Sequence, residues 1–406
     1  MKTILPKIKF KKFYEKWNRK KLQSIAPLRG GFAFKSEEFQ DSGIPIVRIS
    51  NIKFDGTVGG EFEYYSKINP DEKFVLRGRS ILLAMSGATT GKIAMLDSEE
   101  EYYQNQRVGY FQNTGAVDYD FLSSVLQTKK FTNQLNSVLV AGAQPNISSK
   151  EIDSFVFYIP ESLDEQSSIG SLFRTLDDLL ASYKDNLANY QSLKATMLSK
   201  MFPKAGQTIP KIRLDGFEGE WEEKKLSEIV DIVGGGTPDT NVKEYWDGEI
   251  NWFSPTEVGN SIYLDTSEKR ISELGLQKSS AKILPANRTI LFTSRAGIGS
   301  VGIITKDSTT NQGFQSLVTK KGIDIYFLFS YSSEITRYAL KHSAGSTFLE
   351  ISGKELGKMD IIIPSYDEQK AIGAYFSNLD NLINSHQEKI SQLETLKKKL
   401  LQDMFI

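Results

Sequence analysis

Residues 164–202 read DEQSSIGSLFRTLDDLLASYKDNLANYQSLKATMLSKMF, and residues 367–405 read DEQKAIGAYFSNLDNLINSHQEKISQLETLKKKLLQDMF. Both stretches begin with Asp-Glu-Gln, end with Met-Phe and place apolar residues three or four positions apart. This period is typical of an amphipathic helix. Its average is close to 3.5 residues per turn, as in helices that pack along a partner helix. We therefore predict two long helices that pack against each other.

The apolar stripes of the two stretches define the predicted seam between the helices. The seam residues are Ile169, Phe173, Leu176, Leu180, Tyr183, Leu187 and Tyr190, then Ile372, Phe376, Leu379, Ile383, His386, Ile390 and Leu393. The same spacing continues through Leu193 in the first stretch and Leu396 in the second. A helix of about 40 residues is roughly 60 Å long, so we also expect it to act as a spacer. The alternative is that each helix packs only on its own domain.

The rest of the chain repeats as well. Residues 6–25, PKIKFKKFYEKWNRKKLQSI, match residues 210–229, PKIRLDGFEGEWEEKKLSEI, without a gap. Before each helical stretch lie short β-branched and aromatic runs, such as IPIVRI at 44–49, SILLAM at 80–85 and RTILFT at 288–293. Gly, Pro, Asn and Ser separate these runs, which is typical of strands joined by turns.

A mixed α/β (α+β) fold with an internal pseudo-two-fold repeat follows. Two globular domains, each followed by a long helix, account for both periodicities. The expected segments are globular domain 1–160, central helical spacer 161–203, globular domain 204–363 and C-terminal helical spacer 364–406.

The composition is that of an ordinary globular protein. The 406 residues are 39% hydrophobic and 25% charged, and their formal net charge is zero. No apolar run is long enough to cross a bilayer, so we expect no membrane partner and a cytoplasmic location. Zero net charge argues against a protein that coats nucleic acid through bulk charge. Any nucleic-acid binding must come from local patches.

Several kinds of catalytic site are excluded. The chain has no Cys and only two His, His342 and His386, so it has no cysteine-ligated zinc, no thiol nucleophile and no His pair at metal spacing. It also lacks the Pro-Pro pair of the tetrapeptide that marks adenine methyltransferases. We predict no catalytic residues and no metal site.

The stretch Gly87–Lys92 resembles a phosphate-binding loop, but its glycine spacing is one residue short. Ile93 stands where such a loop has Ser or Thr, and the matching stretch 294–300 contains no lysine. A turn between two strands therefore explains these glycines better.

The duplicated order of elements resembles the specificity subunit of type I restriction-modification enzymes. The resemblance covers nearly the whole chain and is strongest from Lys194 through Met201-Phe202-Pro203 to Gly216-Phe217 and Trp221. It implies that each globular part is a target recognition domain, that each domain reads one half of a split DNA site, and that the helices form an antiparallel coiled coil. Because the two copies differ in sequence, the site need not be palindromic.

The resemblance also implies partners. Double-stranded DNA would be bound together with two modification (methyltransferase) subunits and with restriction (translocase/nuclease) subunits. S-adenosylmethionine, ATP and Mg²⁺ would act in those partner subunits, and this chain would bind no cofactor. Its contribution would be to direct adenine methylation and restriction to a sequence.

Residues that differ between the copies at matched turns are the best candidates for reading bases, since identical residues support the shared fold. Polar groups near strand ends can reach the edges of a groove. The DNA-binding candidates are Arg48, Ser50, Asn51, Lys53, Thr89, Thr90, Lys92 and Arg107 in the first copy, and Thr256, Glu257, Ser294, Arg295, Ser300 and Gln315 in the second.

Two alternatives remain open from the sequence. The chain could be a single-chain DNA-modifying enzyme whose active site is not recognised, or a helical structural adaptor that does not read DNA. Activity of the isolated chain would indicate the enzyme, and a footprint without sequence preference would indicate the adaptor.

Overall fold

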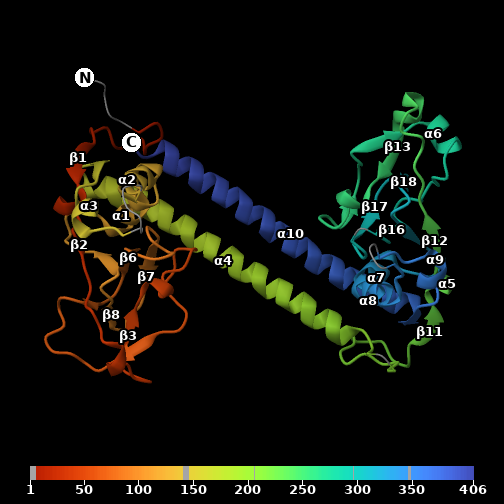
Figure 1. Cartoon of the computed structure of the whole chain (residues 1–406), viewed down its shortest axis with the longest axis horizontal. Coiled ribbons are helices and arrows are strands. Elements are labelled where there is room, and N and C mark those ends of the chain that lie inside the picture. The colour runs from red at the N-terminus through yellow and green to blue at the C-terminus, as the bar shows by residue number, and fades with distance from the viewer. Residues whose placement is uncertain (1–5, 140–145, 205, 296, 346–348) are drawn as a thin grey trace. The chain divides into compact units, whose positions relative to one another are not determined.

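The computed structural model describes residues 6–139, 146–204, 206–295, 297–345 and 349–406. The chain forms two compact units. Unit 1 comprises Met1–Lys184 and Glu388–Ile406, and unit 2 comprises Asp185–Gln387. Two long helices, α4 (Leu163–Met201) and α10 (Tyr366–Asp403), each contribute one part to unit 1 and the other part to unit 2 (Figure 1). Each long helix is therefore shared between the two compact units.

Unit 1 combines short strands with short helices. Its strands are β1 (Asn18–Lys21), β2 (Leu28–Arg29), β3 (Ile44–Val47), β4 (Glu63–Tyr65), β5 (Val75–Leu76), β6 (Ser80–Ala84), β7 (Ile93–Leu96), β8 (Tyr102–Gln104), β9 (Val108–Phe111) and β10 (Val156–Ile159). Its short helices are α1 (Tyr119–Leu126), α2 (Lys129–Leu139) and α3 (Ser149–Asp153). One sheet has the order β2-β9-β6-β7, another has the order β4-β3-β8-β5, and β1 pairs with β10. The first sheet is antiparallel, whereas β3 and β8 run parallel.

Unit 2 repeats this arrangement. Its strands are β11 (Glu222–Lys225), β12 (Val230–Gly234), β13 (Trp246–Phe253), β14 (Tyr263–Leu264), β15 (Lys269–Ile271), β16 (Thr289–Phe292), β17 (Val301–Ile304), β18 (Ser308–Thr310), β19 (Gln315–Thr319) and β20 (Asp360–Ile363). Its short helices are α5 (Leu226–Ile229), α6 (Glu273–Gln277), α7 (Ile325–Ser330), α8 (Ser332–His342) and α9 (Gly353–Leu356). The sheets have the orders β12-β19-β16-β17-β14, β15-β13-β18 and β11-β20. The predicted mixed α/β fold with two copies is confirmed.

The Asp-Glu-Gln motif explains how each long helix is anchored to its globular domain. The amide of Gln166 donates to Pro160 O (2.8 Å) and accepts from the backbone N–H of Asp118 (2.8 Å). Gln369 makes the same two contacts, with Pro364 O (3.0 Å) and the N–H of Asp324 (3.1 Å). Both glutamines are buried, and these bonds satisfy their amides inside the protein.

The glutamate of the same motif has different partners in the two copies. In unit 2 the guanidinium of Arg213 donates to both oxygens of buried Glu368, at 2.8 and 2.7 Å. In unit 1 Glu165 accepts from the Trp17 indole (3.1 Å), and its Oε2 has no hydrogen-bond partner among the described residues. Lys9 stands at the position of Arg213. Burial raises the pKa of Glu165 above its ordinary value.

Exchanging these cations is expected to change stability in opposite directions. Lys9→Arg should stabilise unit 1 by about 1 kcal/mol, because a planar guanidinium can bind both carboxylate oxygens. Arg213→Lys should destabilise unit 2 by about 2 kcal/mol for the converse reason. Both changes can be measured by urea unfolding that is monitored through hydrogen exchange in each unit. If both substitutions changed the free energy of unfolding in the same direction, the roles assigned to Lys9 and Arg213 would be wrong.

The raised pKa of Glu165 adds a pH dependence to this prediction. Its contribution to stability is fully present below the unfolded-state pKa of about 4.3 and is lost as pH rises through the higher folded-state pKa. Lys9→Arg should reduce that loss.

The long helices pair in antiparallel fashion within each unit. In unit 1 Lys397 forms an ion pair with Asp177, and Lys184 pairs with Glu394 (2.8 Å). The partner number on α10 falls as the number on α4 rises.

In unit 2 the rings of Tyr190 and His386 lie 5.1 Å apart, and Lys194 pairs with Asp380. The order is again reversed along the two helices. The ion pairs of Asp177 and Asp380 occupy equivalent positions in the repeat, so the pairing itself follows the pseudo-two-fold relation.

The seam residues divide into a buried group and a half-buried group. Buried are Ile169, Phe173, Leu176, Leu180, Ile372, Phe376, Leu379, Ile390 and Leu393, and half-buried are Tyr183, Leu187, Tyr190, Ile383 and His386. The first turns of α10 also pack into the core of unit 2, where Ile372, Phe376 and Leu379 join Trp221. The expected continuation through Leu193 and Leu396 is wrong, because these side chains are 42% and 45% exposed. The spacing of an apolar stripe does not indicate which part of the helix is covered by a domain.

Three further expectations concern the turn at residues 87–92, membrane spans and metal sites. The stretch Gly87–Lys92 is a turn between β6 and β7, closed by hydrogen bonds from Thr90 N to Gly87 O (3.1 Å) and from Lys92 N to Thr89 O (2.9 Å), so the turn prediction is confirmed. No helix within the described part of the chain is long and apolar enough to cross a membrane. Over the same residues, no cluster of three or more His, Asp or Glu side chains is placed to hold a metal ion.

Candidate nucleic-acid interface

Most candidate residues lie at strand ends, where the backbone leaves a sheet. In unit 1 Arg48, Ser50 and Asn51 follow β3, Lys53 comes shortly after them, Thr89, Thr90 and Lys92 lie between β6 and β7, and Arg107 precedes β9. In unit 2 Thr256 and Glu257 follow β13, Ser294 and Arg295 follow β16, Ser300 precedes β17, and Gln315 begins β19. Gln315 lies against α9, beside Gly353.

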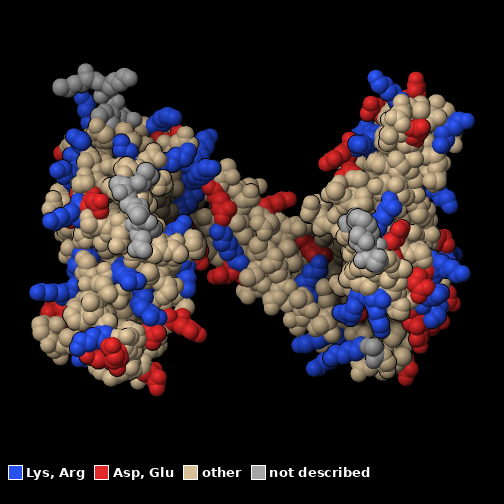
Figure 2. Space-filling model, viewed as in Figure 1, with Lys and Arg blue, Asp and Glu red and all other residues tan. Residues whose placement is uncertain are grey.

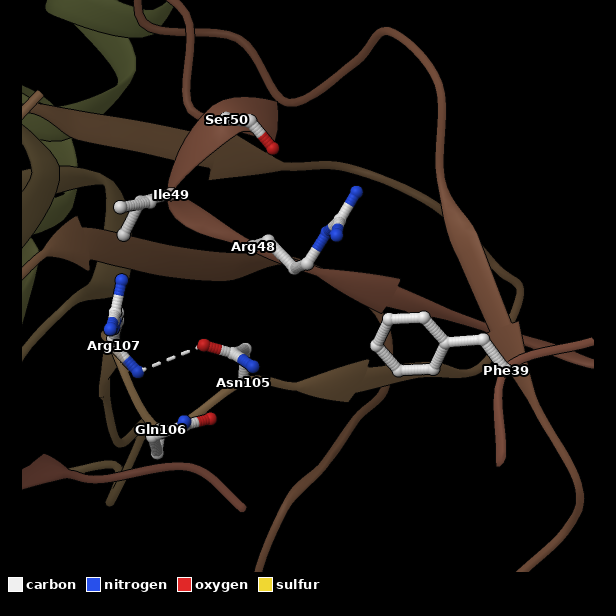
Figure 3. A pocket seen from close by; sticks show the side chains of 7 residues that line it. All are labelled: Phe39, Arg48, Ile49, Ser50, Asn105, Gln106 and Arg107. Carbon is white, nitrogen blue, oxygen red and sulfur yellow. Dashed lines mark hydrogen bonds between the residues drawn. The ribbon is translucent and has the colours of Figure 1, made fainter. Parts of the chain in front are cut away.

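A cavity of about 320 Å³ in unit 1 brings three of these residues together. It is lined by Phe39, Arg48, Ile49, Ser50, Asn105, Gln106 and Arg107 (Figure 3). Arg48 donates to Glu63 (3.1 Å), its guanidinium lies 5.9 Å from the centre of the Phe39 ring, and its Nε is buried without a partner among the described residues. The guanidinium of Arg107 is exposed, with no ion-pair or hydrogen-bond partner found within the described ranges. Arg107 is therefore available to a ligand.

The neighbouring turns connect to this cavity. Thr89 Oγ1 donates to Ile49 O (3.1 Å), and Lys53 Nζ donates to Ser50 O (3.1 Å). Lys92 Nζ lies 4.7 Å from the centre of the Phe54 ring. These contacts gather Lys53, Thr89 and Lys92 around the loop that carries Ser50. Thr90 caps its own turn by donating to Gly87 O.

The loop beside the cavity is built on the same backbone frame in both copies. Asn105 Oδ1 accepts from the N–H of Arg107 (3.1 Å), and Asn311 Oδ1 accepts from the N–H of Gly313 (2.8 Å). The N–H of each asparagine donates to the last residue of the adjacent strand, at 3.1 Å in β3 and 3.0 Å in β13. The asparagine repeated at positions 105 and 311 is thus a structural support.

The turn after β3 or β13 is capped in the same way. The N–H of Arg48 donates to Asn51 Oδ1 (2.9 Å), and the N–H of Ser254 donates to Glu257 Oε2 (2.7 Å). Different residue types therefore perform one structural task at equivalent positions.

The side chains at the tips of this frame differ. Four equivalent positions carry different residues in units 1 and 2: Arg48 and Ser254, Ser50 and Thr256, Lys92 and Ser300, and Arg107 and Gly313. A shared frame with different tips is the pattern expected of two readers of different sequences.

Three candidates are engaged inside the protein instead. Asn51 is 1% exposed, and its amide donates to Gly59 O and Glu61 O (3.3 and 2.8 Å). Glu257 accepts from Ser254 through Oε2 and from the N–H of Glu268 through Oε1 (2.6 Å). Ser294 is fully buried. Their positions at strand ends suggested exposure, but capping and burial occupy their polar groups, so none of the three is retained as a base-contact candidate.

Sequence reasoning missed a structural glycine in each copy. A Cβ on Gly31 would lie 2.3 Å from Asn105 O, and a Cβ on Gly235 would lie 2.0 Å from Asn311 O. Only glycine allows this close approach of two backbones. The signal was present in the sequence as Gly30-Gly31 and Gly234-Gly235-Gly236.

Charge is dispersed rather than concentrated on the face shown in Figure 2. On the face shown in Figure 2, Lys and Arg side chains in each unit are interspersed with Asp and Glu. On the face shown, this distribution agrees with the net charge of zero, and local loops are the candidate contact sites there.

Comparison with known proteins gives the same family twice in one chain. Residues 14–190 and 218–395 each match the family described as the type I restriction modification DNA specificity domain. The MjaIX specificity subunit of Methanocaldococcus jannaschii is 38% identical over 192 residues, which cover 46% of this chain and 44% of the relative. The EcoR124I/EcoR124II specificity subunit of Escherichia coli is 32% identical over 190 residues, covering 45% and 46%.

These two matches span about half the length of each relative. A longer match, 24% identical over 405 residues, covers 95% of this chain and 92% of the putative MjaX specificity subunit of M. jannaschii. Among solved structures, the S subunit of a type I restriction-modification system from M. genitalium superposes with a TM-score of 0.66 at 16% identity, covering 99% of both chains. At that identity the superposition supports the fold alone.

Proposed function

The chain belongs to the family of type I restriction-modification DNA specificity subunits, and from this premise we propose that its two globular domains read the two halves of a split, asymmetric DNA site. In this proposal the chain is non-catalytic and directs adenine methylation and restriction by partner subunits. Residues 1–160 and 204–363 act as target recognition domains, and residues 161–203 and 364–406 act as helical spacers.

One observation carries this proposal: the loop frames of the two copies are equivalent while their tip residues differ. A homodimer would present identical tips and require a palindromic site, whereas this chain presents two different sets. The proposed base-contact and phosphate-contact residues are Arg48, Ser50, Lys53, Thr89, Thr90, Lys92 and Arg107 in unit 1 and Thr256, Arg295, Ser300 and Gln315 in unit 2.

Sequencing the methylated bases of cells with and without this gene tests the proposal directly. We expect one methylated motif of two separated parts to disappear on deletion, and a footprint of the assembled complex to show two protected parts. Methyl transfer or cleavage by the isolated chain would overturn the non-catalytic assignment. A footprint without sequence preference would instead favour a structural adaptor.

The partners are proposed to dock on the helices. S-adenosylmethionine, ATP and Mg²⁺ would be bound by the modification and restriction subunits. Two pairs of exposed leucines support two equivalent docking sites, namely Leu179 with Leu396 in unit 1 and Leu193 with Leu382 in unit 2, all between 41% and 45% exposed.

The two pairs occupy equivalent places. Leu179 lies two residues after Asp177 and Leu396 lies directly before Lys397, so the Asp177–Lys397 ion pair places both leucines at one level. The Asp380–Lys194 ion pair does the same for Leu382 and Leu193. Identical apolar pairs in otherwise different copies suit two copies of one partner, the modification subunit.

Replacing one leucine pair with serine should remove one modification subunit. We expect Leu179→Ser with Leu396→Ser to weaken one docking site about tenfold, since two apolar contacts are lost. Native mass spectrometry should then show one bound subunit in place of two. Leu193→Ser with Leu382→Ser should do the same for the other site.

The exposed residue Leu340 of α8 offers a matched control, since Leu340→Ser removes an apolar side chain of similar exposure (49%). It should leave two subunits bound. Unchanged stoichiometry in both double variants would contradict the docking assignment.

A further inference from the structure

Phe54 is the most exposed large apolar side chain of the described residues, at 76%. It lies at the tip of the turn Lys53–Thr57, directly after the loop that carries Ser50. Its ring is presented to the outside beside the proposed reading loops.

The turn that holds Phe54 is closed by several hydrogen bonds. The N–H of Lys53 donates to Thr57 O (3.0 Å), and the carboxylate of Asp55 accepts from the N–H and hydroxyl of Thr57 (3.0 and 2.7 Å). These bonds lower the pKa of Asp55, so the carboxylate stays ionised. The N–H of Met95 in β7 donates to Gly56 O (2.9 Å) and fixes the turn to the sheet. The ring is therefore displayed from a fixed base, at little further cost in entropy on binding.

A cation accompanies the ring. Lys92 Nζ lies 4.7 Å from the centre of the Phe54 ring. Lys53, the residue before Phe54, donates its Nζ to Ser50 O. An aromatic face beside ammonium groups matches the chemistry of a nucleotide, whose base can stack while its phosphate meets the cations.

The second copy lacks this pair on the same backbone. The N–H of Ile303 donates to Ile262 O (2.7 Å), as Met95 does to Gly56 O in the first copy. That register places Asn260 at the position of Phe54 and Ser300 at the position of Lys92. The fold therefore does not require an aromatic residue at this tip.

Resting on the proposed function, we propose that Phe54 inserts against one base step of DNA in or beside the first half-site and partly unstacks it, while Lys92 binds the adjoining phosphate. Apolar side chains unstack base steps in this way in other DNA-bending proteins. Because the second copy has Asn260 and Ser300 at the positions of Phe54 and Lys92, this insertion is proposed for the first domain only.

The test uses the full chain assembled with its modification subunits and the cognate duplex, with 2-aminopurine placed at successive positions through and beside the first half-site. Fluorescence should rise at one base step with the unaltered chain and should fall to the level of free duplex with Phe54→Ala. Phe54→Leu, which retains an apolar wedge, should keep part of the rise. Phe54→Ala should also weaken cognate binding roughly tenfold, within the range for losing one base-stacking aromatic.

Two controls separate the possible outcomes. Asn260→Ala, at the equivalent tip of the second copy, should leave the signal unchanged. A methyltransferase flips its target base, so 2-aminopurine at the methylated adenine should brighten in every variant and report an intact complex.

The inference fails and the proposed function stands in two cases. In the first, the complex binds both half-sites specifically, but 2-aminopurine brightens at no position besides the methylated adenine. In the second, the same base step brightens equally with the Phe54→Ala variant. If no sequence-specific binding is found, both fail. Loss of modification subunits from Phe54→Ala would assign the ring to a protein contact and overturn the inference.

Discussion

Replacing Phe202 with alanine is expected to destabilise unit 2 by about 3–5 kcal/mol, the usual cost of removing a buried phenyl ring. Phe202 is buried directly after α4, with its ring centre 5.1 Å from that of Tyr331, 5.5 Å from Phe327 and 6.1 Å from Trp221. No small shift of one neighbour can fill the space of the lost ring.

Hydrogen exchange of the full chain measures this effect unit by unit. Amide protection in the core of unit 2 should fall by roughly 100-fold or more, since 1.4 kcal/mol corresponds to a factor of ten. Phe405, the equivalent residue, packs on Trp17 and Phe173 in unit 1 but is half-buried, so Phe405→Ala should cost less and affect unit 1. Leu193→Ala, at an exposed site, should change neither unit by more than about 0.5 kcal/mol. If Phe202→Ala lowered amide protection equally in both units, the assignment of Phe202 to the core of unit 2 alone would be wrong.

Arg107→Ala is expected to relax base preference at one position of the first half-site and to weaken cognate binding by up to about 100-fold. The expectation follows from the exposed guanidinium of Arg107 beside the cavity and from the value of an arginine–guanine contact, about 1–3 kcal/mol. The second half-site should be read as before. Binding selection from a duplex library, randomised in both halves, measures the two preferences together.

Two further variants define what Arg107 contacts. Arg107→Lys keeps the charge but loses the planar fork, so it should restore affinity only if the contact is with a phosphate. Arg295→Ala, in unit 2, should alter the second half-site and leave the first unchanged. A uniform loss of affinity over all sequences with Arg107→Ala would assign the residue to the DNA backbone rather than to a base.

The candidate site could be predicted in outline but not residue by residue. Comparison of the copies led to loops at strand ends, because a tip residue that differs on a common frame is visible in one sequence. It could not separate Arg107 from Asn51, since both are polar and both follow a strand. Only the tertiary structure shows that the amide of Asn51 is consumed by Gly59 O and Glu61 O, while the guanidinium of Arg107 is exposed.

Phe54 was not singled out for a similar reason. One aromatic residue in a turn carries no periodic signal, and its significance comes from Lys92, which lies far along the sequence and close in space. Exposure and the companion cation are properties of the folded chain.

The sequence by itself determined the two long helices, the strand-rich domains before them and their duplication, because periodicity and repeats are properties of residue order. The matched stretches beginning at Asp164 and Asp367 indicated the helices, and the β-branched and aromatic runs before them indicated the strands. The tertiary structure alone decided which parts of each apolar stripe are covered. Ile372 and Phe376 enter a globular core, whereas Leu193 and Leu396 stay exposed, because burial depends on which distant segments pack against a helix and not on its own spacing.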